Sequence, residues 1–284
     1  MAPYGRASRF GVPLLTILAL CAARPSGDLA AQAAQASSRT LTTAAEREAF
    51  LAEARVVRDR PVGKGVTNTL RVTLTDGVVT HDASVQTIDE YKAIFQGTQG
   101  TEVNFRDSWR YNVAAYRIDR LLEMGMIPAT VERAHKGQTG SFTWWVDDVL
   151  MDEQEHFHKK RPTPNLGDWN QQMWTTRLFD QLIANVDRNL GNLLIDKAWD
   201  VWLIDHSRAF RLNATPKTPA NLTRVDRALL DRLRGMDAEG VRRAVGDYLT
   251  AEEIAALLKR RDFIVSHFER GGGALVFNRR PRCC

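Results

Sequence analysis

The stretch that decides the fold is Asn185-Val-Asp187-Arg188-Asn189-Leu-Gly-Asn192, together with Trp202-Leu-Ile-Asp205-His206 further on. It places a carboxylate, an amide five residues later and a second carboxylate thirteen residues after that, each following an apolar run. Phosphoryl transfer uses such a set, because one Asp orients the attacking hydroxyl while an Asn and another Asp hold Mg²⁺ on the nucleotide phosphates. The spacing therefore predicts Asp187 as a catalytic residue and Asn192 and Asp205 as metal ligands.

The composition is that of an ordinary globular protein. With 284 residues, of which 44% are hydrophobic and 26% charged, the chain can bury a large core as one two-lobed domain or two small ones. The net charge of +5 is spread along the chain and no Lys/Arg block alternates with aromatic residues, so no nucleic-acid partner is expected. The cysteines, Cys21, Cys283 and Cys284, lie at the two ends, so the apolar core has to stabilise the body without a disulfide framework.

The N-terminus has the pattern of a targeting segment. Arg6 and Arg9 precede a short apolar run, Phe10 to Ala23, and small residues follow. This pattern predicts a secretory signal peptide over residues 1–33, and the run is short for a membrane span. We therefore expect a secreted or periplasmic protein. The alternative is an uncleaved N-terminal anchor, which would be the only membrane contact. Residues 34–45 are polar and small, and are expected to form a flexible tether.

Hydrophobic periodicity predicts an α+β protein with a strand-rich first half and a helical second half. The expected domains are an N-lobe over residues 46–148, a C-lobe over 149–278 and a tail over 279–284. The expected elements are a helix over 43–57, strands over 70–74 and 78–88 around an Asp76-Gly77 turn, a helix over 109–124, strands over 128–131 and 142–146, a loop over 159–168, a helix over 169–184, and helices after residue 210.

In the order of these predicted elements and motifs, the chain resembles the atypical branch of the protein-kinase-like fold. That branch includes phosphatidylinositol 3- and 4-kinases, HipA-type kinases and the secretory-pathway kinases of the Golgi lumen. The resemblance covers residues 62–277 and is specific over Phe179–Arg188, at Asn192 and over Leu203–Asp205, where His206-Ser207 replaces the usual Phe-Gly. It implies a two-lobed fold with ATP and Mg²⁺ or Mn²⁺ as cofactors.

The resemblance also implies roles for individual residues. Asp187 matches the Asp that positions the acceptor hydroxyl, and Arg188 would organise the catalytic loop through carboxylate or phosphate pairing. Val146 lies where such folds join their lobes, so its backbone could meet the adenine. The Gly63-Lys64-Gly65 turn lies where such folds have a phosphate-covering loop. Its small residues would allow the backbone to approach the phosphates closely.

One part of the family pattern is missing. Such kinases carry a Lys on the third strand that pairs with a Glu on the N-lobe helix, whereas here the alignment places Gln86 and Asn112 at those positions. Both charges are lost together, so an amide–amide pair is expected in place of the ion pair. Lys64 could supply a cation from the glycine turn or be a solvated turn residue. An alignment that used Lys92 instead is disfavoured, because Lys92 falls beyond the strand pattern.

These observations favour an exported, Mg²⁺-dependent ATP phosphotransferase. Two alternatives stay open: a pseudokinase that binds partners through the inherited cleft, and a nucleotidyl transferase that moves AMP. The sequence does not distinguish a protein, lipid or small-molecule hydroxyl as the acceptor.

Overall fold

The computed structural model of the chain describes residues 39–63, 69–97, 100–280 and 282. The expected signal peptide, Lys64 and Gly65 lie outside the described residues. Within the described ranges, no helix is both long and apolar enough to span a bilayer.

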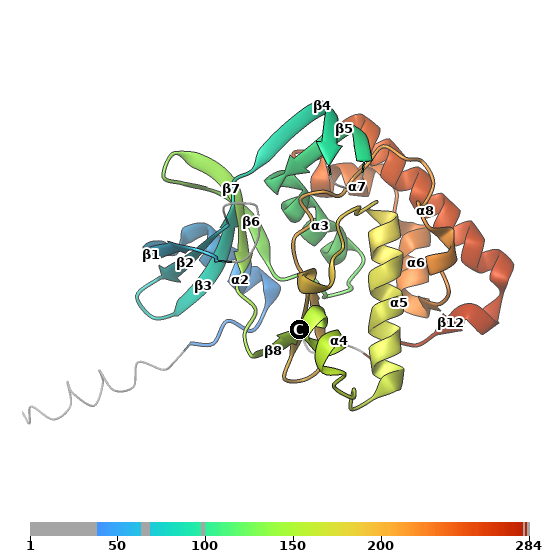
Figure 1. The fold of residues 1–284 in the computed structure, drawn as a ribbon, viewed down its shortest axis with the longest axis horizontal. Coiled ribbons are helices and arrows are strands. Elements are labelled where there is room, and N and C mark those ends of the chain that lie inside the picture. The colour runs from blue at the N-terminus through green and yellow to red at the C-terminus, as the bar shows by residue number, and fades with distance from the viewer. Residues whose placement is uncertain (1–38, 64–68, 98–99, 281, 283–284) are drawn as a thin grey trace, which may run out of the picture. The chain divides into compact units, whose positions relative to one another are not determined.

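The first half of the described chain is built on an antiparallel sheet of five strands in the order β1-β2-β3-β7-β6 (Figure 1). Alternate residues of β2 and β3, such as Val72, Leu74 and Val85, are buried, as the period-2 pattern predicts. The turn between these two strands is closed by Asp76, whose side chain accepts hydrogen bonds from the next two amides after Gly77. The strands are β1 (Arg55–Pro61), β2 (Leu70–Thr75), β3 (Thr80–Gln86), β6 (Thr130–His135) and β7 (Gln138–Trp144).

Two helices, α2 (Ala44–Glu53) and α3 (Trp109–Leu121), pack against β6 and β7. Helix α2 begins with a capping box between Thr43 and Glu46. It ends four residues earlier than the expected helix over 43–57, because β1 starts at Arg55 and pairs with β2. Leu41 is also buried, so the end of the expected tether is part of the folded body.

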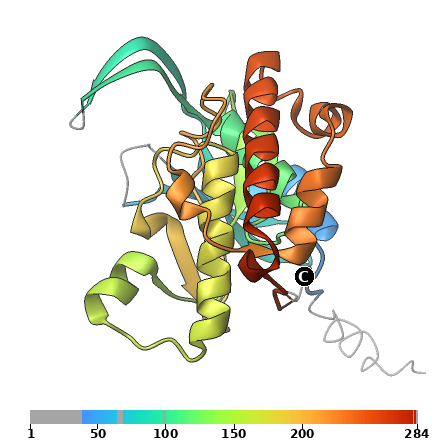
Figure 2. The same ribbon diagram turned by 90° about the vertical axis from the view of Figure 1, so that its right-hand side faces the viewer.

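A feature missed by the sequence analysis is the ribbon formed by β4 (Asp89–Gly97) and β5 (Gly100–Ser108). Among the described residues these strands pair with each other and with no other strand, and they extend as an arm, in teal, away from the larger sheet (Figure 2). The ribbon is anchored by Glu102, which forms ion pairs with Arg208 and Arg211 in the segment after Asp205.

The second half is mainly helical, with one small sheet in the order β10-β9-β8 and a parallel pairing of two short strands. Helices α5 and α8 contact each other and appear side by side in Figure 2. Helix α4 ends where the expected loop over 159–168 begins, and α5 starts inside that loop, at Leu166. Residues 211–224, where helix was expected, are irregular except for a 3-10 turn over Pro219–Asn221. The elements are β8 (Val149–Asp152), α4 (Glu153–Lys159), α5 (Leu166–Leu182), β9 (Leu193–Asp196), β10 (Val201–Leu203), β11 (Val225–Asp226), α6 (Arg227–Gly235), α7 (Ala238–Val245), α8 (Ala251–Gly271) and β12 (Val276–Phe277).

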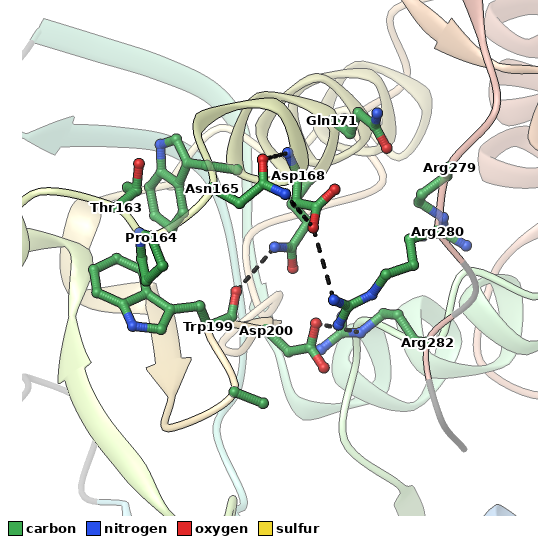
Figure 3. A pocket seen from close by; sticks show the side chains of 13 residues that line it. Thr163, Pro164, Asn165, Asp168, Gln171, Trp199, Asp200, Arg279, Arg280 and Arg282 are labelled. Carbon is green, nitrogen blue, oxygen red and sulfur yellow. Dashed lines mark hydrogen bonds and ion pairs between the residues drawn. The ribbon is translucent and has the colours of Figure 1, made fainter.

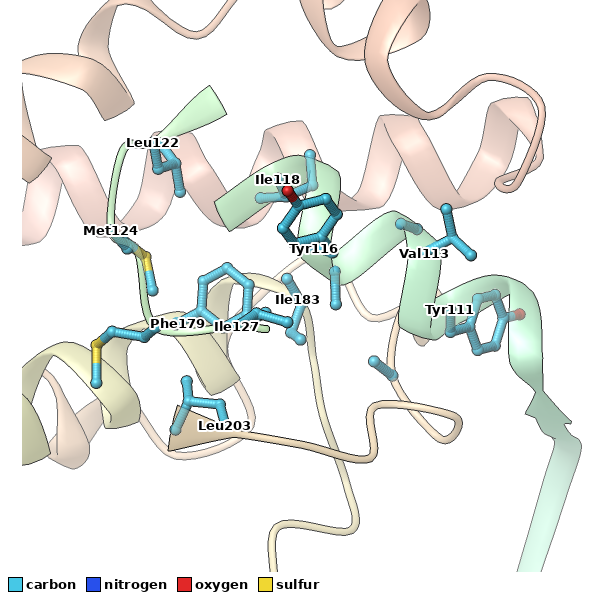
Figure 4. Close-up of a cluster of buried hydrophobic side chains, with 14 of the residues drawn as sticks. Tyr111, Val113, Tyr116, Ile118, Leu122, Met124, Ile127, Phe179, Ile183 and Leu203 are labelled. Atoms are coloured by element: carbon cyan, nitrogen blue, oxygen red, sulfur yellow. The ribbon is translucent and has the colours of Figure 1, made fainter. Parts of the chain in front are cut away.

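The hydrophobic core joins the two halves. Figure 4 shows side chains of α3, such as Tyr116 and Ile118, near Phe179 and Ile183 at the end of α5 and Leu203 on β10. These side chains are nearly inaccessible to solvent. Because the core holds the ends of α5 and β10, it fixes the two loops that follow them, which are the loops with Asp187 and Asp205.

Of the tail expected over residues 279–284, the structure describes Arg279, Arg280 and Arg282. The Arg279 amide donates to Asp226 Oδ1 at 2.8 Å, and Arg282 Nη1 donates to the Val201 carbonyl at 2.8 Å. The side chain of Arg282 is only 9% exposed, and its guanidinium lies over the Trp202 ring. The described tail residues therefore pack on the helical half.

Candidate active site

The loop between α5 and β9 holds Asp187 and Asn192 close to each other. The Asp187 amide donates to Asn185 Oδ1 at 3.1 Å, and Asn192 Nδ2 donates to the Asp187 carbonyl at 3.4 Å. Asp205 follows β10 with a φ of 55°, the left-handed region that Asp adopts more readily than most residues. The Asp205 carboxylate acts electrostatically on Asp187, so the two predicted carboxylates share one site.

Arg188 ties these two loops together. Its Nε and Nη2 donate to the Asp180 carboxylate at 3.0–3.2 Å, and its Nη1 donates to the carbonyls of Asn192 at 3.2 Å and Ile204 at 2.9 Å. Its Nη2 also reaches His206 Nε2 at 2.9 Å. The guanidinium is thus engaged within the protein on every nitrogen. Of the two pairings that the sequence left open for Arg188, the structure contains the carboxylate pairing.

His206, which stands where the family has Phe, is a buried neutral base. Burial and the adjacent Arg188 guanidinium lower the pKa of His206 well below its usual value, so its Nε2 accepts a hydrogen bond from Arg188. The ring also packs edge-on against Phe179, with centroids 6.2 Å apart. His206 therefore makes an aromatic contact, as Phe could, and adds a hydrogen-bond acceptor that Phe lacks.

Gln86 and Asn112 form a hydrogen-bonded pair, with Asn112 Nδ2 donating to Gln86 Oε1. Asn112 Oδ1 accepts from the His206 amide at 2.7 Å, while Gln86 Nε2 lies 3.5 Å from Asp205 Oδ1. The structure thus brings Gln86, on β3, and Asn112, on α3, to the Asp205 segment. The site has amides where the family has an ion pair.

The position of Gln86 depends on Gly140 in the neighbouring strand. A Cβ at residue 140 would lie 2.3 Å from the Gln86 carbonyl oxygen and 2.8 Å from Thr87 Cγ2. We expect Gly140→Ala to lower the free energy of unfolding by about 1–3 kcal/mol, because the β3 backbone must move away. Gly235→Ala is the control, since a Cβ there meets nothing within 4 Å. Urea denaturation of both variants gives the comparison, and equal stabilities would contradict the close approach at Gly140.

The remaining predicted nucleotide contacts are placed only in part. Val146 lies in the connection from β7 to β8, between the strand-rich and helical halves. Gly63 lies in the connection from β1 to β2, while Lys64 and Gly65 are outside the described residues. Lys92 is on the β4–β5 ribbon, outside the five-stranded sheet that holds Gln86, and pairs with Glu90 at 2.8 Å.

Two site residues were missed by the sequence analysis. Arg208 is the charged group that most strongly lowers the pKa of Asp187, whereas burial and the Asp205 carboxylate raise that pKa above its usual value. Asp107 lies beside Ser207 and Asp205, and burial raises its pKa. The adjacent Ser108 is the N-cap of α3, where its side chain accepts from the Arg110 amide. No sequence signal marks Arg208, because its proximity to Asp187 comes from the fold of the segment after β10.

The site has oxygen ligands that suit Mg²⁺ or Mn²⁺. Asp205 Oδ1 accepts a hydrogen bond from Ser207 at 3.1 Å, while Asn192 uses its amide nitrogen as a donor and keeps its oxygen for other contacts. Among the residues that the structure describes, no three His, Cys, Asp or Glu side chains form a metal cage. Mg²⁺ commonly binds through one or two carboxylates plus substrate phosphates, so the set fits a metal that arrives with a nucleotide.

A cavity of about 210 Å³ lies at the other end of α5 (Figure 3). It is lined by Trp169, Trp199 and arginines of the tail. Two of its arginines pair with lining carboxylates, Arg280 with Asp168 at 3.7 Å and Arg282 with Asp200 at 3.9 Å. Because Asp187 follows the opposite end of α5, this cavity is separate from the candidate active site.

Comparisons with known proteins agree with this architecture. No family model and no curated protein matches the sequence. Among solved structures, hydra Fam20 with sugar has a TM-score of 0.62 at 15% identity, covering 84% of this chain and 94% of that one. The Golgi casein kinase with Mn/ADP bound has a TM-score of 0.57 at 13% identity, covering 84% and 80%. The chain therefore has the atypical protein-kinase-like fold, α+β with a strand-rich and a helical lobe.

Proposed function

We propose that this protein is a metal-dependent ATP phosphotransferase that acts on a hydroxyl acceptor. The observation that carries the proposal is the Arg188 network, which ties the loop of Asp187 and Asn192 to the segment of Asp205. Phosphoryl transfer depends mainly on positioning and on charge neutralisation, and this network would supply the positioning. The Mn/ADP complex of the Golgi casein kinase supports ATP and Mg²⁺ or Mn²⁺ as cofactors.

In this proposal each residue has one task. The acceptor oxygen attacks the γ-phosphorus, the bond from that phosphorus to the ADP oxygen breaks, and the hydroxyl proton passes to the Asp187 carboxylate. A raised pKa suits Asp187 to this role, because it is then a better proton acceptor at neutral pH. Asn192 and Asp205 would hold the metal ion, which when bound neutralises charge on the phosphates. The Val146 backbone would contact the adenine, and Gly63, Lys64 and Gly65 would cover the phosphates.

We further propose that Arg208 supplies the positive charge that Gln86 does not carry. Its side chain is 24% exposed, forms an ion pair with Glu102 and packs over Phe105, with its Cζ 4.8 Å from the ring centroid. Its Nε is buried and makes no hydrogen bond within the described residues. A cation held beside Asp187 can meet the γ-phosphate, where negative charge must be stabilised.

Arg208→Gln is therefore expected to weaken ATP binding about tenfold or more while changing ADP binding little, since a charge-assisted hydrogen bond contributes about 1.5–3 kcal/mol. Titration of both nucleotides in the presence of Mg²⁺ measures the preference. The control is Arg243→Gln, which removes the same charge from an exposed pair with Glu239 on α7. An unchanged ATP-to-ADP preference in Arg208→Gln would exclude contact with the γ-phosphate.

The amide pair of Gln86 and Asn112 favours one rival function, a pseudokinase scaffold that binds nucleotide without turnover. The test is incubation of the purified protein with γ-labelled ATP and Mg²⁺ or Mn²⁺, with label transfer to itself or to added acceptors as the readout. Metal-dependent nucleotide binding without transfer of phosphate or AMP would support the scaffold. A mass gain of AMP on a target would support nucleotidyl transfer. Export also stays a prediction, which N-terminal sequencing of secreted protein would test.

A further inference from the structure

A second cavity, of about 320 Å³, adjoins the catalytic loop. Its wall includes Asn185, Val186 and Arg188, which flank Asp187 on both sides. Consecutive Cα atoms are about 3.8 Å apart, so the cavity wall lies next to the backbone of Asp187, the residue proposed to orient the acceptor. Its volume is in the range of small-molecule sites, which begins at about 300 Å³.

The cavity carries an excess of positive charge. Arg177, on α5, and Lys217, in the irregular segment after β10, line it, and both are exposed. In the described part of the chain neither makes an ion pair. The lining carboxylate, Asp180, is already neutralised by Arg188, at 3.0 Å. The positive potential of Arg177 and Lys217 is therefore available to a ligand.

Most of the remaining wall is polar and uncharged, apart from Arg211, which pairs with Glu102, and the apolar Ala184 and Val186. Asn213, Thr215 and Asn221 contribute amide and hydroxyl groups, and each of these residues is exposed. Such groups both donate and accept hydrogen bonds, as hydroxyl-rich ligands require. The apolar residues of the wall, Ala184 and Val186, are outnumbered by the polar ones.

The wall is held in place by buried contacts. Gln181 Oε1 accepts from the Thr218 amide at 2.8 Å, which joins α5 to the irregular segment. Arg260, on α8, is fully buried and donates to the carbonyls of Leu182 at 2.7 Å and Asn213 at 2.5 Å. The cavity is thus preorganised, which lowers the entropic cost of ligand binding.

We infer that this cavity binds the anionic group of the acceptor, and that the acceptor is a sugar-sized hydroxyl compound with a phosphate or a carboxylate. The inference rests on the proposed function, because it names the acceptor class of the same site. Arg177 and Lys217 bind the anion, and the polar wall binds the hydroxyl groups.

The test is direct binding to the nucleotide-free full chain, which needs no transfer activity. Glucose 6-phosphate, glucuronate and neutral glucose are the probes, titrated by calorimetry. We expect the two anionic probes to bind at least about tenfold more tightly than glucose, and Arg177→Gln/Lys217→Gln to remove that difference. The control, Arg242→Gln/Lys259→Gln, removes two exposed cations from α7 and α8 and should retain it.

The relative affinities of glucose 6-phosphate and glucuronate then tell whether phosphate or carboxylate is preferred. Anion binding that is unaffected by Arg177→Gln/Lys217→Gln, or glucose that binds as tightly as the anions, would overturn the inference. Either result leaves the phosphotransferase proposal to its own assay. Conversely, the protein could bind anions through Arg177 and Lys217 and yet transfer no phosphate. That result would support the anion site and reject the proposed function.

Discussion

Asp187→Asn is expected to slow γ-phosphate transfer by about 10²- to 10⁴-fold, the usual contribution of a positioned general base. The substitution keeps the size of the side chain and removes its ability to accept the acceptor proton. The loop itself should persist, because its bonds to Asn185 and Asn192 use the Asp187 backbone. Mg²⁺–ATP affinity should therefore change little.

Asp205→Asn is the matched comparison, because it makes the same carboxylate-to-amide substitution at a proposed metal ligand. It should reduce both metal-dependent nucleotide binding and transfer, because a neutral amide is a poorer Mg²⁺ ligand than a carboxylate. Initial rates with γ-labelled ATP and nucleotide titrations with and without Mg²⁺ separate the two variants. Equal transfer rates in the unchanged protein, Asp187→Asn and Asp205→Asn would reject the roles assigned to Asp187 and Asp205.

The parts of the fold predicted correctly are those with strong local patterns. Alternation over β2 and β3 determines which of their residues face the core, and the long helix α5 overlaps the helix predicted over 169–184. Alignment by strand and helix therefore put Gln86 and Asn112 at corresponding positions, and the structure has them hydrogen-bonded. Their roles in nucleotide binding stay a prediction.

The parts of the fold and site that the sequence did not predict lack a local sequence pattern. Residues of β4 are mostly exposed on both faces, so the strand shows no alternation, and its pairing depends on β5 and on the Glu102 anchor. Arg208 reaches Asp187 only because the segment after β10 folds back on the catalytic loop, where the Val186 amide donates to the Arg208 carbonyl at 3.5 Å. Long-range contacts of this kind leave no periodic pattern in the sequence.

Arg188→Met is expected to lower the free energy of unfolding by about 3–5 kcal/mol, the usual cost of breaking a buried ion pair by removing one partner. The side chains of Arg188 and Asp180 are 12% and 9% exposed, so the orphaned Asp180 carboxylate could not be solvated well. Urea denaturation measures the loss. Asp180→Leu/Arg188→Met should cost less than the sum of the two single changes, because the double variant leaves no unpaired charge.

Stability alone does not distinguish a structural arginine from one that positions the site, so the folded variants need a second readout. Arg188→Lys keeps the charge but cannot bridge Asp180, the Asn192 carbonyl and the Ile204 carbonyl in one plane. Because those bonds join the loops of the two proposed metal ligands, Arg188→Lys should lose metal-dependent ATP binding while it still unfolds cooperatively. A folded Arg188→Lys protein with unchanged metal-dependent binding would mean that the core alone positions Asn192 and Asp205, and that Arg188 has no part in assembling the site.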